Sequence, residues 1–254
     1  MTGPRPGAPA TTSPLLSARD LVKSYRGADG QPAPVLRGIS LEVAAGELVA
    51  VVGPSGSGKS TLLHCLSGLE RPTSGSVRIA GTDLTGLSRS ALARVRRERV
   101  GFVFQAYDLI SSLTAWDNVA LPARLARRAV REEDVERALA HVGLSGRARA
   151  KPAALSGGQQ QRVAVARALA VERDLVFADE PTGALDTTSG AQVLALLRAA
   201  ASGARSVVLV THDLQAAALA DRVLVLRDGL LHVELRGASA ADLLEAVAAA
   251  AVRG

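Results

Sequence analysis

The sequence predicts an α/β fold in which a mostly parallel core sheet is accompanied by an antiparallel β lobe and an inserted helical lobe. Three observations predict it. The apolar stretch 48–52 leads into a glycine-rich phosphate-binding loop that is followed by a helix. Helical periodicity dominates from about residue 88 to residue 144. After residue 155, helix-like and strand-like segments alternate, which favours a parallel sheet covered by helices.

The amino-terminal third accounts for the β lobe. Residues 1–13 are rich in proline, glycine and threonine and are expected to form a disordered tail. One large domain is expected over 14–237. Within it, turn signals such as Ala80-Gly81 and Asp29-Gly30 separate short predicted strands, which lie at 15–25, 35–43 and 76–80.

The helical lobe is expected as an insertion at about 88–165. A helix over 88–99 would be capped by Ser88 or Ser90, whose hydroxyls can accept a hydrogen bond from the first turn. A second helix is predicted over 131–142, where the apolar residues share one face.

The carboxy-terminal half completes the core sheet. Its predicted segments are helix 159–170, strand 175–178, helix 189–201, strand 206–210 and strand 222–226. Asp228-Gly229 predicts a hairpin turn into a last strand at 230–235. A short final helix is expected within 238–254, where Ser239 and Asp242 have the spacing of a capping box.

Composition bounds the class of protein. A chain of 254 residues that is 48% hydrophobic can bury a large core but cannot hold two full nucleotide-binding domains. Its single cysteine, Cys65, excludes an internal disulfide and favours a reducing, cytosolic setting. No apolar stretch approaches the roughly 20 residues that cross a bilayer, so the chain is expected to be soluble by itself.

Basic residues are strongly biased towards arginine. Only Lys23, Lys59 and Lys151 are lysines among the 30 basic residues, and the net charge is +6. The arginine-rich groups 94–99 and 124–131 lie on predicted helices with acidic residues nearby, and only 2% of the chain is aromatic, which leaves few rings for base stacking. We expect solvated helix faces there, with contact to anionic lipid or a protein partner as the lesser alternative, and no nucleic-acid partner.

The run from Gly53 to Thr61 has the pattern of a phosphate-binding loop. A chance match in a chain of this length has odds on the order of one in a hundred. Its glycines can adopt positive φ and turn backbone N–H groups towards phosphate oxygens, while Lys59 suits the β and γ phosphates and Ser60 suits Mg²⁺. A turn that binds nothing would need neither lysine nor a hydroxyl. The predicted nucleotide contacts are Gly53, Pro54, Ser55, Gly56, Ser57, Gly58, Lys59, Ser60 and Thr61.

Asp179 and Glu180 follow the predicted strand 175–178. Because successive strand side chains point to opposite faces, the two carboxylates are expected to have different roles. Asp179 is predicted to hold Mg²⁺ through water, and Glu180 to orient or deprotonate an attacking water. An ordinary acidic strand end is the alternative, which the phosphate loop upstream makes less favoured.

Ser156, Gly157, Gly158 and Gln159 open a predicted helix and suggest a second anion site. Ser156 and Gln159 have capping-box spacing, so a well-capped helix start is the simpler explanation. That explanation does not account for two helix-weakening glycines, whose N–H groups could bind an anion together with the positive end of the helix dipole.

The string from Leu155 to Gln159 resembles the signature motif of ABC ATPases, and the resemblance extends over about 15–235 with the family's motifs in order. It implies the ABC ATPase fold, with ATP and Mg²⁺ as cofactors. Four further residues match family positions: Tyr25 the adenine-stacking aromatic, Gln105 the glutamine loop with a place at the metal, Asp186 the dimer-contacting loop and His212 the switch histidine. Singly, each has a simpler explanation, such as a strand tyrosine, a loop amide, a helix cap or a strand-end histidine.

The resemblance also implies a mechanism and partners. In this family two cassettes pack head to tail, which implies a homodimer in which the Ser156–Gly158 loop closes on the ATP of the other copy. Glu180 would then act as general base and His212 as the γ-phosphate contact, with Lys59 and Gln105 completing the catalytic set. The implied partner is an integral membrane permease on a separate chain, with this ATPase cytoplasmic and peripheral on the inner face of the membrane.

Three phrases are similar to the lipoprotein-release and macrolide-export class of the family, at 113–119, 157–164 and 180–186. Departures from the family pattern are Tyr107-Asp108 and Ser111-Ser112, where Phe-Asn and Leu-Pro are more usual, and Asp117, where glutamate is frequent. These positions face the partner in relatives, so the subclass and the substrate do not follow from this chain, whereas ATP hydrolysis is still expected. The similarity to this class implies export or mechanotransmission.

Two other functions are weighed against transport. A soluble ABC ATPase acting on DNA or ribosomes would generally carry two cassettes or a long coiled-coil insertion, and this sequence has neither. An inactive ATP-binding regulator is less favoured still, because every expected catalytic position is filled.

Overall fold

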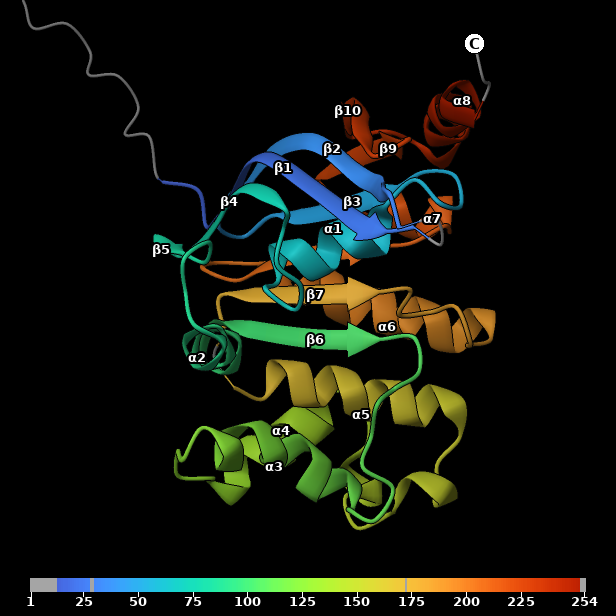
Figure 1. Ribbon diagram of the computed structural model, residues 1–254. Helices are drawn as coiled ribbons and strands as arrows, with labels where there is room; N and C mark the ends of the chain where they lie inside the picture. The colour runs from blue at the N-terminus through green and yellow to red at the C-terminus, as the bar shows by residue number, and fades with distance from the viewer. Residues whose placement is uncertain (1–12, 28–29, 172, 252–254) are drawn as a thin grey trace, which may run out of the picture.

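The computed structural model describes residues 13–27, 30–171 and 173–251, and it contains two sheets (Figure 1). The smaller sheet is antiparallel, with strand order β2-β1-β4-β5. Its strands are β1 (Leu16–Arg26), β2 (Pro32–Val43), β4 (Ser74–Ile79) and β5 (Thr82–Asp83). The predicted antiparallel β lobe is therefore confirmed. Residues 1–12 of the expected tail, and Asp29 of the predicted turn, lie outside the described residues.

The larger sheet has the order β10-β9-β3-β8-β7-β6, and its pairs are parallel except for β10 with β9. Its strands are β3 (Leu48–Val52), β6 (Val100–Phe104), β7 (Leu175–Asp179), β8 (Ser206–Val210), β9 (Arg222–Arg227) and β10 (Leu230–Arg236). The predicted mostly parallel core sheet and the terminal hairpin are confirmed.

Strand β6 was not predicted from the sequence. It lies within the expected helical lobe of 88–165 and pairs in parallel with β7 at the edge of the core sheet. The helix before it is α2 (Arg89–Arg99), which Ser88 caps by accepting a hydrogen bond from Ala91 N. The helices after β6, together with two short 3-10 turns, form the helical part proper: α3 (Ala115–Leu125), α4 (Glu132–His141), η1 (Ser145–Arg147), η2 (Pro152–Ala154) and α5 (Gly157–Leu169).

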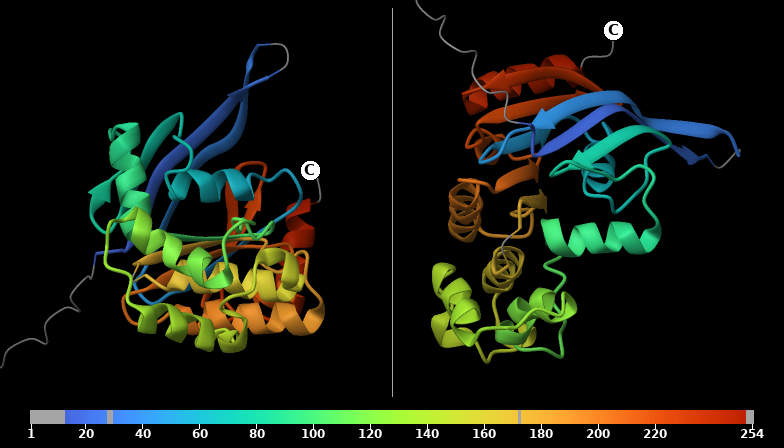
Figure 2. Two further views of the ribbon diagram at one scale, coloured as in Figure 1. Left: turned by 90° about the horizontal axis from the view of Figure 1, so that it is seen from below. Right: turned by 90° about the vertical axis from the view of Figure 1, so that its left-hand side faces the viewer.

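The two faces of the core sheet are covered differently. Helix α1 (Lys59–Leu66) lies between the core sheet and the antiparallel sheet, and their apolar side chains form one cluster. On the opposite face α5 packs against β6, α6 (Thr187–Ala200) against β8, α7 (Leu214–Ala217) against β3 and α8 (Ala240–Ala251) against β9. Helices α3 and α4 lie beyond α5 and pack on it and on each other, and the apolar side chains of this side form a second cluster. Figure 2 shows the β1–β2 pair projecting beyond these layers in both views.

The central position of strand β3 explains why its sequence is apolar throughout. All five residues are buried; Leu48, Ala50 and Val52 join one cluster, and Val49 and Val51 join the other. This alternation buries both faces of a central parallel strand, which is the pattern expected between two helical layers.

The direction of the parallel strands places the polar loops. Strands β3, β7 and β8 are parallel, so their carboxyl ends meet at one edge of the sheet. The glycine-rich loop follows β3, Glu180 follows β7, and Thr211 with His212 follow β8. Ligands bind at this edge in open α/β sheets.

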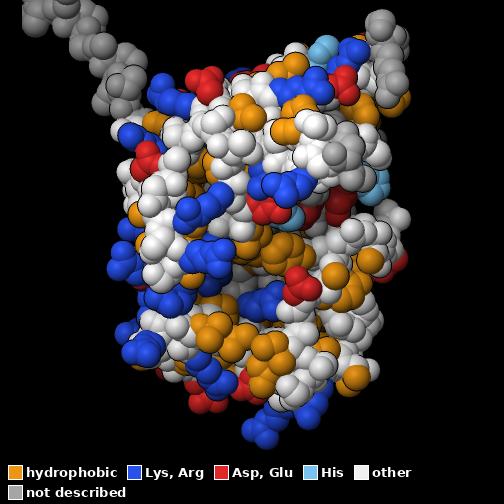
Figure 3. Space-filling model, viewed as in Figure 1, with side chains coloured by type: hydrophobic (Ala, Val, Ile, Leu, Met, Phe, Trp, Pro, Cys, Tyr) orange, Lys and Arg blue, Asp and Glu red, His pale blue; other side chains and the backbone are white. Residues whose placement is uncertain are grey.

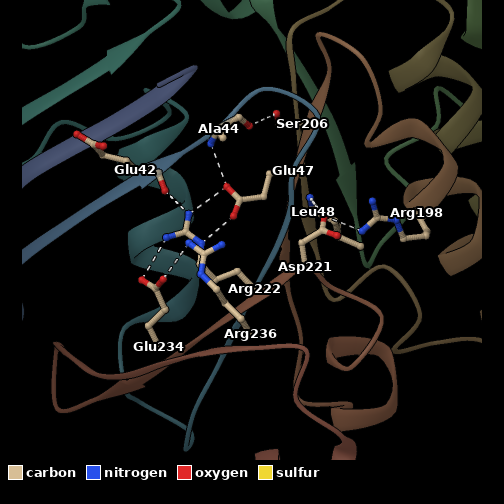
Figure 4. A network of polar contacts seen from close by, with 10 residues as sticks. All are labelled: Glu42, Ala44, Glu47, Leu48, Arg198, Ser206, Asp221, Arg222, Glu234 and Arg236. Carbon is tan, nitrogen blue, oxygen red and sulfur yellow. Dashed lines mark hydrogen bonds and ion pairs between the residues drawn. The ribbon is translucent and has the colours of Figure 1, made fainter. Parts of the chain in front are cut away.

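A buried ion network fixes the hairpin β9–β10 to the rest of the fold (Figure 4). The Arg222 guanidinium donates to Glu47 Oε1 at 2.8 Å, to Glu47 Oε2 at 3.1 Å and to Glu234 Oε2 at 3.1 Å. It also donates to the carbonyl oxygen of Glu42 in β2. One side chain thus links β2, the turn before β3, β9 and β10.

Across the part of the chain that the structure describes, the helices are all too short or too polar to serve as a membrane span.

Candidate functional site

The glycine-rich loop is shaped by three glycines with positive φ. The φ angles of Gly53, Gly56 and Gly58 are 148°, 79° and 99°. A Cβ on Gly53 would lie 2.2 Å from the carbonyl oxygen of Leu226, so only glycine fits between this loop and β9. Gly58 is the N-cap of α1, and no side chain caps that helix start. The first N–H groups of α1 are therefore left for an external acceptor, as in an anion site at a helix terminus.

Lys59 lies across this loop. Its Nζ donates to the carbonyl oxygens of Gly53 and Pro54, both at 2.9 Å. Burial lowers the pKa of Lys59, while the nearby carboxylates of Glu180 and Asp179 raise it. The ammonium is held at the mouth of the loop by weak carbonyl acceptors, so phosphate oxygens of higher charge can replace them.

Asp179 ends β7 and faces the start of α1. Ser60 Oγ donates to Asp179 Oδ1 at 3.4 Å. Burial raises the pKa of Asp179, and the neighbouring charge of Glu180 acts in the same direction. The predicted meeting of Ser60 with Asp179 is thus present although 119 residues separate them.

These oxygens fit a magnesium ion. Mg²⁺ prefers oxygen ligands and commonly takes one or two from the protein, with phosphates and water completing the shell. Within residues 13–27, 30–171 and 173–251 there is no group of three or more His, Cys, Asp or Glu side chains that could hold a metal without such help. The hydroxyl of Ser60 and the carboxylate of Asp179 are the pair on which a nucleotide-bound ion would rest.

Glu180 differs from the expectation in how it is oriented. Strand β7 ends at Asp179, and Glu180 has a φ of 46°, so a left-handed backbone turns it away from Asp179. Its Oε2 accepts from His212 Nδ1 at 2.9 Å and from Thr211 Oγ1 at 3.4 Å. The separation of the two carboxylates therefore comes from a strained residue and not from strand alternation. Such strain recurs at functional sites.

Tyr25 lies beside α1 at the end of β1. Its ring is partly exposed, and its hydroxyl donates to Glu70 Oε2 at 2.5 Å. Burial raises the pKa of Tyr25, and the hydrogen bond to Glu70 adds to this. The structure therefore places an aromatic ring next to the glycine-rich loop helix, where the sequence predicts an adenine contact.

The segment Ser156–Gln159 forms the predicted capping box at the start of α5. Gln159 N donates to Ser156 Oγ at 3.3 Å, and Ser156 N donates to Gln159 Oε1 at 3.0 Å. The glycines also have a packing role, because a Cβ on Gly157 would lie 2.7 Å from Tyr107 Oη and one on Gly158 would lie 2.5 Å from Ser189 Oγ. In the described residues no hydrogen bond or ion pair joins this segment to the glycine-rich loop, so its anion-binding role stays a prediction.

Two other predicted residues have local partners. Gln105 is exposed, and its Nε2 lies so close to Gly183 that a Cβ built on Gly183 would be 2.8 Å from it. Asp186 caps α6 by accepting from Ser189 N at 2.9 Å, which is the simpler explanation weighed above. A metal role for Gln105 and a dimer contact for Asp186 remain predictions.

Sequence reasoning missed two side-chain connections near the site. Gln161 of α5 is fully buried and donates to the carbonyl oxygens of Phe104 and Pro181, so it ties β6 to the segment after Glu180. Arg167 donates to the carbonyl oxygens of Tyr107 and Asp108, which both have positive φ. Two consecutive positive φ values in residues other than glycine are rare, but they leave no trace in sequence patterning.

The arginine group 94–99 lies on α2 as predicted, but the group 124–131 is not on a helix as a whole: Arg124 is in α3, whereas Arg127, Arg128 and Arg131 lie in the connection between α3 and α4. Arg89, Arg94, Arg97 and Arg99 of α2 are all exposed, and Figure 3 shows basic side chains gathered over this part of the molecule. Arg99 pairs with Asp174 at 2.7 Å. This agrees with a solvated helix face.

Comparison with known proteins identifies the family. The family model described as ABC transporter matches residues 36–183. The chain is 51% identical over 221 residues to the pyoverdine export ATP-binding/permease protein PvdT of Pseudomonas putida, covering 86% of this chain and 34% of that protein. It is 50% identical over 222 residues to the macrolide export ATP-binding/permease protein MacB of Escherichia coli strain K12, with 85% of this chain and 34% of that protein covered.

A solved structure gives the same assignment over a whole chain. The dimeric post-hydrolysis state of the ATP-binding cassette MJ0796 bound to ADP and Pi has a TM-score of 0.81 and 36% identity, and the match covers 89% of this chain and all of that one. This chain spans about a third of the length of the curated relatives given above. Fold, motif order and sequence identity agree that the chain belongs to the ABC transporter family.

Proposed function

We propose that this chain is the ATP-hydrolysing cassette of an ABC exporter. The observation that carries the proposal is the convergence of Lys59, Ser60, Asp179, Glu180 and His212 at the carboxyl edge of the core sheet. An ammonium, a metal-binding pair and a base with an imidazole partner together make up the set that phosphoryl transfer to water requires.

Each residue has a distinct task in this proposal. Lys59 exchanges its carbonyl contacts for the β and γ phosphates, and the uncapped start of α1 supplies further N–H donors. Ser60 and Asp179 hold Mg²⁺, which supplies charge neutralisation on the phosphates when bound. Glu180 accepts the proton of the attacking water, and His212 then turns from Glu180 towards the γ-phosphate. Tyr25 stacks on the adenine.

The active form that we propose is a homodimer with two composite sites. The Ser156–Gly158 segment of one copy would close on the nucleotide held by the other. The dimeric state of the similar cassette MJ0796 supports this arrangement, as do the N–H groups at the start of α5. Gln105 is proposed to take part at the metal once the site has closed.

The partner that we propose is an integral membrane permease on a separate chain, with the cassette at the cytoplasmic face. Relatives named for export of pyoverdine and of macrolides support the export class. No observation on this chain favours the alternative of a soluble ATPase acting on DNA or ribosomes. The substrate is set by the permease.

The test uses the variant Glu180→Gln. Removing the base should trap ATP between two copies, so light scattering coupled to size exclusion should show a dimer with Mg-ATP and a monomer without it. Phosphate release should be lost in Glu180→Gln and in Lys59→Ala. A monomer at saturating ATP would overturn the composite site.

A second variant separates the two halves of the proposal. Ser156→Arg in the Glu180→Gln background places a bulky cation where the partner's phosphates would lie. It should bind ATP as the parent does but remain monomeric. Glu234→Gln, on the far hairpin, is the matched control and should dimerise like the parent.

A further inference from the structure

We propose that Lys23 and Glu70 are positioning residues that orient the Tyr25 ring and thereby set how tightly the site holds the base of a bound nucleotide. This inference rests on the proposed binding of ATP beside Tyr25. It concerns two residues that the motif analysis did not single out.

The geometry is a closed set of contacts around one ring. Lys23 Nζ lies 4.8 Å from the centroid of the Tyr25 ring, 3.3 Å from Glu70 Oε2 and 2.9 Å from the carbonyl oxygen of Arg71. The same Glu70 oxygen accepts from the Tyr25 hydroxyl at 2.5 Å. The Lys23 side chain is only 16% exposed. Both the tilt and the hydroxyl end of the ring are therefore fixed.

The choice of lysine at this position is informative in a chain that uses arginine for nearly all its basic residues. An ammonium has three N–H donors in diverging directions, and here each has one acceptor: a carbonyl, a carboxylate and a ring face. A guanidinium presents its donors in one plane and cannot aim at these three targets at once. Lys23 thus has a geometric reason to remain lysine, as Lys59 does in the phosphate loop.

Glu70 connects the ring to the helix that starts at the phosphate loop. Its N–H donates to the carbonyl oxygen of His64 in the last turn of α1 at 3.0 Å. On the other side, Ser24 N donates to Thr73 Oγ1 at 3.0 Å, so β1 is tied to the same connection. The ring is held in a constant position relative to α1, and a base stacked on it would have a constant position relative to phosphates at the other end of α1.

The ammonium also acts on the ring electronically. A cation over one face of tyrosine is attracted to its π electrons and occupies that face. A base can then stack only on the opposite face, against a ring whose electron density is drawn towards Lys23. The purine ring of a nucleotide is electron-rich, so this arrangement favours stacking of adenine or guanine.

The test compares ligands that do and do not contain a base. Titration calorimetry with Mg²⁺ would measure the dissociation constants of ADP, GDP and pyrophosphate for the native protein, Lys23→Met and Glu70→Gln. Each variant should weaken the binding of ADP and of GDP about fivefold. Each variant should change the dissociation constant of pyrophosphate by less than about twofold, because the phosphate loop is untouched.

Lys23→Arg tests the geometric argument. This variant keeps the positive charge but not the three directions of the N–H donors, so it should weaken ADP binding about as much as Lys23→Met does. Arg19→Gln and Glu42→Gln are matched controls on the same sheet, where the two side chains are 76% and 57% exposed. Both should bind all three ligands like the native protein.

The outcomes distinguish this inference from the proposed function. Unchanged ADP affinity in Lys23→Met and Glu70→Gln would overturn the inference, as would an equal loss for pyrophosphate. Native ADP affinity in Lys23→Arg would also overturn it. If the native protein bound neither ADP nor pyrophosphate, the proposed function itself would fail.

Discussion

Replacing Arg222 with methionine should destabilise the protein more than any surface substitution on the same hairpin. Methionine fills much of the volume of the arginine stem but removes the guanidinium. The change leaves Glu47, which is only 11% exposed, without its cation, and leaves the Glu42 carbonyl without a donor.

The magnitude follows from burial. Removing one partner of a buried ion pair costs about 3–5 kcal/mol because the remaining charge stays desolvated. Glu47 keeps the hydrogen bond from Ala44 N at 2.9 Å, and Glu234 is 37% exposed and can be solvated. We therefore expect the lower end, about 3 kcal/mol. For a domain of this size, that corresponds to a fall in Tm of roughly 6–12 °C.

Thermal unfolding of the nucleotide-free protein, followed by circular dichroism, would measure this. Arg236→Met is the matched control: it removes an arginine from the same hairpin that is 67% exposed and lies 3.5 Å from Glu234, so no measurable change is expected. Adding Glu47→Gln to Arg222→Met should recover part of the loss, because the unpaired charge is removed. A fall in Tm of less than about 3 °C for Arg222→Met, or no recovery in the double variant, would refute the reasoning.

Three further predictions concern other parts of the fold. Asp179→Asn should stabilise the nucleotide-free protein by about 1 kcal/mol at pH 7. Burial raises the folded-state pKa of Asp179, so the stabilising contribution of the protonated carboxyl is full below the unfolded-state pKa and is lost as the pH rises through the folded-state pKa. The melting curves of the native protein and of Asp179→Asn should therefore differ at pH 7 and converge at pH 4. Gly75→Ala should lower the free energy of unfolding by about 3 kcal/mol, because Gly75 has a φ of 89° and the new Cβ would lie 2.4 Å from the carbonyl oxygen of Asp20. Gly86 has open space around it, so Gly86→Ala is the control and should leave the free energy of unfolding, measured in urea, unchanged. Gln161→Leu should lower the rate of phosphate release more than ATP affinity, because it leaves the Pro181 carbonyl without its buried donor next to Glu180 and leaves the Phe104 carbonyl only the bond from Tyr107 N at 3.4 Å.

Much of the fold follows from local patterns. The strand at 206–210 is found at the predicted residues, and the start of α5 and the cap at Ser239 follow from capping-box spacing. The glycine-rich loop needs its residue types for steric reasons that act within a few positions. These features were predictable because the information lies in adjacent residues.

Other features depend on contacts between distant segments. Strand β6 is a five-residue apolar run between two helical stretches, and nothing in its own residues tells a strand from a buried helix turn. The orientation of Glu180 depends on the left-handed backbone that the neighbouring strand β8 imposes through the bond from Glu180 N to Val210 O. The partnership of Lys23 and Glu70 joins residues 47 positions apart, and its one visible sign in the sequence was the scarcity of lysine.

The contact between Glu180 and His212 bears on how the carboxylate at the end of β7 is oriented. Glu180 Oε2 accepts from both His212 and Thr211, so these two residues fix the orientation of the carboxylate. The His212 side chain is 74% exposed, so its rotation would disturb no packing and would release the carboxylate. We therefore expect the Glu180 carboxylate to keep this orientation in the nucleotide-free protein until the imidazole moves.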